Sequence, residues 1–179
     1  MDEVEKSLEE YKKIADLVPD DASVHLSIGN IYLKQGKNED AIAEYKQVIT
    51  LAPDSPIGYN ELAYYYAENK TNLDEGLKYA LKAAELVPKD ASILDTLGWV
   101  YFKKGIYKKA LENLISAVEL RPSSPTIRFH LGMAHYKNND LKNALSEFKN
   151  SLIISGRFNE ASQSQEMVKL IENQLNQAQ

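Results

Sequence analysis

Apolar residues recur along most of the chain at the spacing of one face of a helix. Between residues 22 and 35 they lie at Val24, Ile28, Ile31 and Tyr32, close to the i, i+3, i+4 pattern of an amphipathic helix. A second apolar face follows Gly36, at Ala41, Ile42, Tyr45, Val48 and Ile49. The pattern predicts two helices joined by a short turn, each with a polar face toward water.

This pair of helices repeats. Four prolines are spaced 34, 35 and 34 residues apart, and small and aromatic residues keep step with them. The prolines are Pro19, Pro53, Pro88 and Pro122; the small residues of the first helix are Gly29, Ala63, Gly98 and Gly132; those of the second are Ala41, Gly76, Ala110 and Ala144; the ring-bearing residues are Tyr32, Tyr66, Tyr101 and His135. Such a period is typical of a solenoid, in which each unit buries its apolar face against its neighbours.

The ends of the predicted helices carry ordinary stop signals. Gly36, Gly105 and Asn139 follow the first helix of their units, where a left-handed residue ends a helix. Proline then closes each second helix because it cannot continue one. The second unit has one extra residue near Asn69–Asn72, in its inter-helix turn.

These residues resemble the tetratricopeptide repeat (TPR) family. The family motif is Leu-Gly then Tyr in a first helix, Ala then an aromatic in a second, and Pro at the end. It appears here as Ile28-Gly29…Tyr32…Ala41…Tyr45…Pro53 and as Leu97-Gly98…Tyr101…Ala110…Pro122, while the fourth unit has Gly156 in place of the proline. The resemblance implies an all-α fold, an α-solenoid of antiparallel helix pairs in a right-handed superhelix.

The resemblance also divides the chain. We expect the second helix of an incomplete repeat over residues 1–21, repeats over 22–55, 56–90, 91–124 and 125–158, and a C-terminal capping helix and tail over 159–179. The half-repeat lacks its first helix, so its apolar residues Leu8, Tyr11 and Ile14 are candidates for self-association. The chain is therefore either a piece of a longer array or a unit that covers this face in another way.

Composition narrows the function classes. The net charge of −5 argues against general nucleic-acid binding, which depends on neutralising phosphates. No apolar run approaches the roughly 18 residues that direct membrane insertion requires. The chain has no cysteine, which excludes disulfides and thiolate chemistry but fits any compartment. Localisation, cytoplasmic or periplasmic, stays open because the N-terminus is not necessarily the natural one.

Catalytic motifs are absent from the sequence. It contains no phosphate-binding glycine loop, no G-x-S-x-G and no H-E-x-x-H. His130 and His135 are five residues apart, on different faces of one helix, which does not suit a metal. We therefore expect no enzyme, no metal and no cofactor.

In this family the concave surface, lined by the first helices, usually binds the partner. The register predicts the following residues there: Asn30, Leu33, Asn60, Tyr64, Asp95, Trp99, Phe102, Phe129, Met133 and Tyr136. Six of them form an aromatic, methionine-containing trough across the second to fourth repeats, and such residues dominate binding hot spots. We expect Trp99 to be the central anchor, exposed enough that its removal spares the fold. Packing between helices is the alternative role of each ring.

Charge at the groove suggests what it binds. The family's carboxylate clamp of Lys, Asn and Arg is missing, since the matching positions hold Leu26, Asn30, Glu61, Ser92 and Thr96. Recognition of chaperone tails is therefore not expected. Lys34, Lys103 and Lys137 should line one rim, interrupted by Glu68, and would favour acidic residues beside the apolar side of a ligand.

The leading hypothesis is a non-catalytic interaction scaffold that binds a helical or extended peptide segment of a protein partner in this groove. A second is a structural scaffold that assembles with itself through the half-repeat. A third is the non-catalytic arm of a larger enzyme or of a bacterial envelope or secretion protein. The repeats also look like those of large bacterial proteins, although a scaffold this widely used does not determine function.

Overall fold

The computed structural model describes residues 3–177 and consists there of ten helices with no strand. The helices are α1 (Glu3–Leu17), α2 (Ala22–Lys34), α3 (Asn38–Leu51), α4 (Ile57–Asn69), α5 (Leu73–Leu86), α6 (Ala91–Lys103), α7 (Tyr107–Leu120), α8 (Pro125–Lys137), α9 (Leu141–Ile154) and α10 (Ala161–Gln177). Residues 1–2 and 178–179, which the sequence analysis assigns to the half-repeat and the tail, lie outside the described residues.

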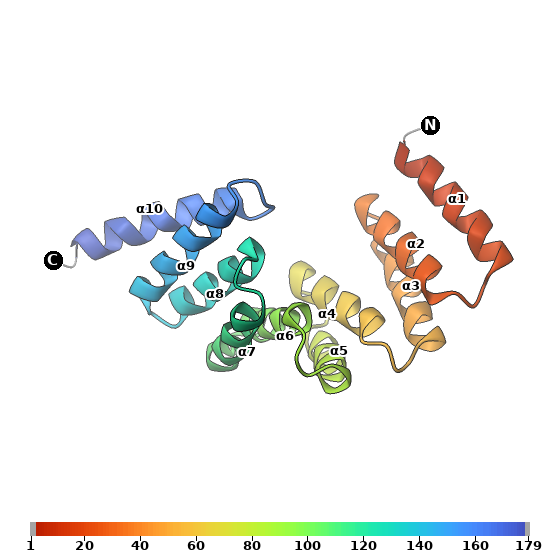
Figure 1. Cartoon of the computed structure of the whole chain (residues 1–179), viewed down its shortest axis with the longest axis horizontal. Coiled ribbons are helices and arrows are strands. Elements are labelled where there is room, and N and C mark those ends of the chain that lie inside the picture. Colours follow the sequence, from red (N-terminus) through yellow and green to blue (C-terminus); the bar gives the residue numbers. More distant parts are fainter. Residues whose placement is uncertain (1–2, 178–179) are drawn as a thin grey trace.

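The helices follow one another in a curved row that opens between α1 and α10 (Figure 1). α2–α3, α4–α5, α6–α7 and α8–α9 pack as antiparallel pairs, and α4 also contacts α6 across the pairs. The inner side of the curve carries α4, whereas α5 and α7 lie on its outer side (Figure 1). The architecture is the expected α-solenoid of helix pairs.

The stop signals act as expected. Each of the four spaced prolines lies two residues beyond the last residue of a helix, and Gly156 has the same position after α9. Gly105 and Asn139 adopt the left-handed backbone, with φ of 78° and 62°. The inter-helix turn of the second pair contains two left-handed residues, Lys70 and Asn72, where each of the other three turns contains one. The extra residue of that repeat is absorbed there.

Close approach of paired helices explains the small residues. A Cβ atom on Gly98 of α6 would lie 2.6 Å from Cγ of Leu114 and 3.2 Å from the carbonyl oxygen of Ala110, both on α7. The side chain of Leu114 is fully buried at this contact. A larger residue at position 98 would therefore force α6 and α7 apart.

The buried side chains form two large neighbouring clusters rather than one spherical core. One joins α1 to α4 around Tyr45 and Leu62, and the other joins α4 to α10 around Leu114, Phe148 and Ile171. α4 contributes to both, so the core continues along the row, as a stack of repeats requires.

α10 covers the last pair. Its Ile171 is fully buried, and the hydroxyl of Ser151 on α9 donates to that of Ser164 on α10 at 3.2 Å. Lys149 of α9 also pairs with Glu172 of α10 at 2.7 Å. The helix thus packs where a further repeat would begin, as a capping helix does.

Candidate partner-binding site

A pocket of about 440 Å³ lies where the first helices of three pairs meet the start of α10. Its aromatic lining is Tyr64 from α4, Trp99 from α6 and Phe129 from α8. Its polar lining is Glu68, Lys103, His130, Asn159, Glu160 and Gln163. The volume falls in the lower part of the range of ligand pockets.

Trp99 lines the pocket but is not the exposed anchor that the sequence analysis expects. It is 4% exposed. Its ring stacks on Phe102 at 4.6 Å between centroids and on His130 at 4.0 Å. This burial places Trp99 in the packing between α6 and α8, so we expect its removal to destabilise the fold rather than spare it.

Phe129 and Asp95 are also more buried than the predicted groove requires, with Phe129 only 2% exposed. Nδ1 of His130 lies 2.8 Å from a carboxylate oxygen of Asp95. A carboxylate accepts hydrogen bonds, so Nδ1 is the donor and, in the neutral ring, Nε2 is left as an acceptor. Asp95 therefore orients His130 in the pocket lining.

Lys103 is not a free rim cation. Its side chain is 12% exposed, and its ammonium lies 4.4 Å from the centroid of the Trp99 ring and 3.4 Å from a carboxylate oxygen of Glu68. The indole N–H of Trp99 donates to the same carboxylate at 2.5 Å. Lys34 and Lys137 stay exposed at their own ends of the row.

Carboxylates dominate the electrostatics around Tyr64. Burial raises the pKa of its hydroxyl well above the ordinary value, and the charges of Glu68, Glu160, Asp95 and Glu61 raise it further. Each of these carboxylates disfavours the negatively charged phenolate form of Tyr64. Lys103 is the single Lys or Arg in the lining among residues 3–177, so the pocket is acidic overall when His130 is neutral.

Seven of the ten predicted groove residues lie outside the pocket lining, namely Asn30, Leu33, Asn60, Asp95, Phe102, Met133 and Tyr136. Asn30 accepts a hydrogen bond of 2.7 Å from the hydroxyl of Tyr45. Leu33 packs in the cluster of the first repeats, whereas Met133 and Tyr136 pack in the cluster that includes α10. Asn60 is half-buried on α4, and Phe102 is half-buried on α6. Whether any of these ten residues binds a partner stays a prediction.

Sequence analysis missed Asn159, Glu160 and Gln163, and treated Glu68 only as a gap in a lysine row. Asn159 and Glu160 directly precede α10 and Gln163 lies in its first turn, a region with no repeat motif that would place it. A hydrogen bond of 3.2 Å from the hydroxyl of Thr126 to Glu160 ties this segment to α8. The capping helix therefore supplies one wall of the pocket.

Other helices of the same chain cover part of the apolar face of the half-repeat. Leu8 is buried against α2 and Tyr11 is half-buried in the same cluster, so the chain itself covers part of this face. Self-association through Leu8, Tyr11 and Ile14 stays a prediction. Ile14 remains exposed, next to Leu17, which is 81% exposed, and Val18. These three residues form the exposed apolar part of the first helix and its end.

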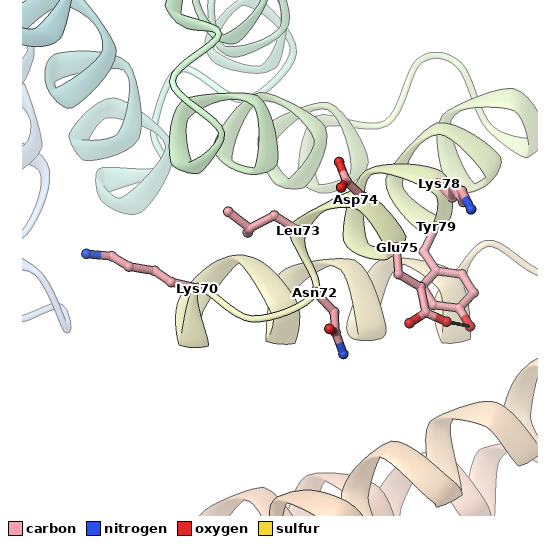
Figure 2. A pocket seen from close by; sticks show the side chains of 7 residues that line it. All are labelled: Lys70, Asn72, Leu73, Asp74, Glu75, Lys78 and Tyr79. Carbon is pink, nitrogen blue, oxygen red and sulfur yellow. Dashed lines mark hydrogen bonds between the residues drawn. The ribbon is translucent and has the colours of Figure 1, made fainter.

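A second hollow, of about 700 Å³, borders the turn between α4 and α5. Its side chains diverge: Lys70 points away from Glu75 and Tyr79, which hydrogen-bond each other at 3.2 Å (Figure 2). Side chains that do not converge on one point cannot fix a ligand. Within residues 3–177 there is also no group of three His, Cys, Asp or Glu side chains placed to hold a metal, and no helix long and apolar enough to cross a membrane.

Comparison with known proteins agrees with this architecture. A family model described as TPR repeat matches residues 29–70 and 98–139. No curated protein sequence matches the chain. Among solved structures, the chain is similar to one in the APC/C hetero-tetramer Cut9–Hcn1, with a TM-score of 0.84 and 18% identity over 94% of this chain and 33% of that one. It thus spans about a third of that chain's length.

Two further solved structures match over most of their own length as well as most of this chain. TTC0263, a thermophilic TPR protein in Thermus thermophilus, has a TM-score of 0.80 and 20% identity over 92% of this chain and 90% of that one. MamA from Desulfovibrio magneticus RS-1 has a TM-score of 0.71 and 21% identity over 86% of each chain. These likenesses show the fold. The matched repeats identify the chain as a member of the tetratricopeptide-repeat family, whose members are protein-interaction scaffolds.

Proposed function

We propose that the chain binds a segment of a partner protein, with one side chain of that segment seated in the pocket lined by Tyr64, Trp99 and Phe129. The observation that carries the proposal is the pocket itself, because it gathers side chains from three repeats and the capping region at one place. Packing already holds the large rings of the lining in place. They therefore offer contact area to a ligand with little further loss of side-chain entropy. Either an amphipathic helix or an extended peptide presents a single anchoring side chain in this way.

The site favours binding over catalysis. Three of its ionisable groups are paired, because His130 hydrogen-bonds Asp95 and Glu68 contacts Lys103 as well as the indole N–H of Trp99. Such pairing fixes side chains for recognition. The TPR fold is generally a non-catalytic scaffold, which agrees with this role.

A selection from a displayed library of random peptides against the immobilised chain tests the proposal. Gln163→Arg places a long side chain at the mouth of the pocket from an exposed position, and Gln165→Arg is its matched control on the same helix outside the lining. We expect selected peptides to bind Gln163→Arg at least about tenfold more weakly, or about 1.4 kcal/mol, and Gln165→Arg unchanged. Peptides insensitive to both changes would contradict the proposal.

Self-association is the second candidate, favoured by the exposed side chains of Ile14, Leu17 and Val18. Because Tyr11 is half-buried, Leu17→Asp is the cleaner test. If the chain assembles through this surface, sedimentation will show concentration-dependent association that Leu17→Asp removes. A monomer at every concentration would exclude this candidate.

A further inference from the structure

We propose that the pocket between α4, α6, α8 and the start of α10 takes an arginine side chain of the partner segment. This inference rests on the proposed function, since it specifies the partner chemistry for the same pocket. It also reverses the preference for acidic ligands that the lysine row suggests.

The lining combines rings with carboxylates, the two groups that a guanidinium recognises. Tyr64, Trp99 and Phe129 supply aromatic surface, and Glu68 and Glu160 supply carboxylates from different elements. Arginine is planar and weakly hydrated for a cation, so it stacks on rings while its N–H groups reach carboxylates in a fork. An apolar side chain would leave both carboxylates facing an uncharged group, at a desolvation cost.

The chain already holds one cation in this setting. The ammonium of Lys103 lies against the Trp99 ring and beside Glu68, at 4.4 Å and 3.4 Å, with most of its side chain buried. These distances are those of a cation–π contact and an ion pair. The environment therefore suits a positive charge, although Lys103 neutralises only part of the negative charge around it.

Glu160 contributes negative charge that Lys103 does not neutralise. Within residues 3–177, its hydrogen bond comes from the neutral hydroxyl of Thr126, at 3.2 Å. Asp95 adds a further carboxylate behind His130. The raised pKa of Tyr64, caused first by burial and then by these carboxylates, agrees with a negative potential in the pocket. Charge complementarity therefore favours a basic occupant over an acidic one.

The test starts from peptides whose binding Gln163→Arg weakens. Each arginine in such a peptide is replaced in turn by citrulline, which keeps the shape and removes the charge. We expect one replacement to weaken binding about tenfold or more, and that loss to shrink in the Glu160→Gln variant. Glu166→Gln is the control, since Glu166 is exposed on α10, six residues further along the chain and outside the lining.

Lys103→Met separates the two charge preferences. If the partner contributes the cation, removing the ammonium of Lys103 strengthens binding of the arginine peptide. If the partner contributes a carboxylate, the same change weakens binding. Pocket-dependent peptides that lack arginine, or that tolerate every citrulline, would overturn this inference and leave the proposed function standing. Failure to obtain any pocket-dependent peptide would overturn both.

Discussion

Glu68 accepts a hydrogen bond of 2.5 Å from the indole N–H of Trp99, and this contact joins α4 to α6 at the lining of the pocket. The same carboxylate lies 3.4 Å from the ammonium of Lys103. Two partners on α6 thus hold one side chain of α4 in place. A ligand meets an acceptor that needs little reorganisation, which favours affinity.

Trp99→Ala should lower the free energy of unfolding by about 3 kcal/mol, since removing a buried ring typically costs 3–5 kcal/mol. The ring stacks on Phe102 and His130, and both would lose packing. Urea unfolding followed by circular dichroism measures the change. Leu17→Ala, at a highly exposed position, is the control and should stay within about 0.5 kcal/mol. Equal effects of the two would contradict the packing described for Trp99.

Gly98→Leu should destabilise the chain by about 3 kcal/mol, at the upper end of overpacking costs. Even a Cβ atom at this position would lie 2.6 Å from Leu114. Gly156→Leu is the control, because nothing lies within 4 Å of a Cβ there. Thermal and urea unfolding of both variants make the comparison. An unchanged Gly98→Leu protein would mean that α6 and α7 are not in this close contact.

His25 should titrate above its ordinary value. Burial lowers its pKa, but hydrogen bonds with Glu44 and the carbonyl of Pro19, and the charges of Glu44 and Asp21, together raise the pKa. A pKa raised by folding adds stability below the unfolded value, about pH 6.5, and that stability is lost as pH rises through the folded value. NMR titration of the imidazole measures the shift.

Glu44→Gln isolates this effect, because Nδ1 of His25 lies 2.7 Å from the Glu44 carboxylate. We expect the variant to lower the pKa of His25 and to be less stable than the parent mainly below about pH 6.5. Above the folded pKa the difference in the free energy of unfolding should narrow. A difference that grows with pH would have the wrong sign.

Ile171→Ala should cost about 3 kcal/mol, because a fully buried isoleucine leaves a cavity. The loss should also speed hydrogen exchange in α9, which α10 covers. Leu170→Ala, one residue earlier and exposed, should have a much smaller effect. If the two variants exchange alike, α10 does not dock through Ile171.

Local chemistry in the sequence determined the helix pairs. Prolines and left-handed residues stop helices wherever they stand, so the spacing of Pro19, Pro53, Pro88 and Pro122 was enough to indicate where four of the helices end. Glycine at position 98 likewise indicated a close contact, because a larger side chain there would clash with Leu114 of the paired helix.

Only the tertiary structure decided which residues of the inner surface remain open. The repeat register placed Trp99, Phe129 and Asp95 on that surface, but their exposure depends on His130 and on neighbours about one repeat away. The position of Lys103 depends on Glu68, and one wall of the pocket comes from a segment outside the repeats. A periodic pattern specifies the face of a helix, whereas the pocket results from contacts between helices, which no single period encodes.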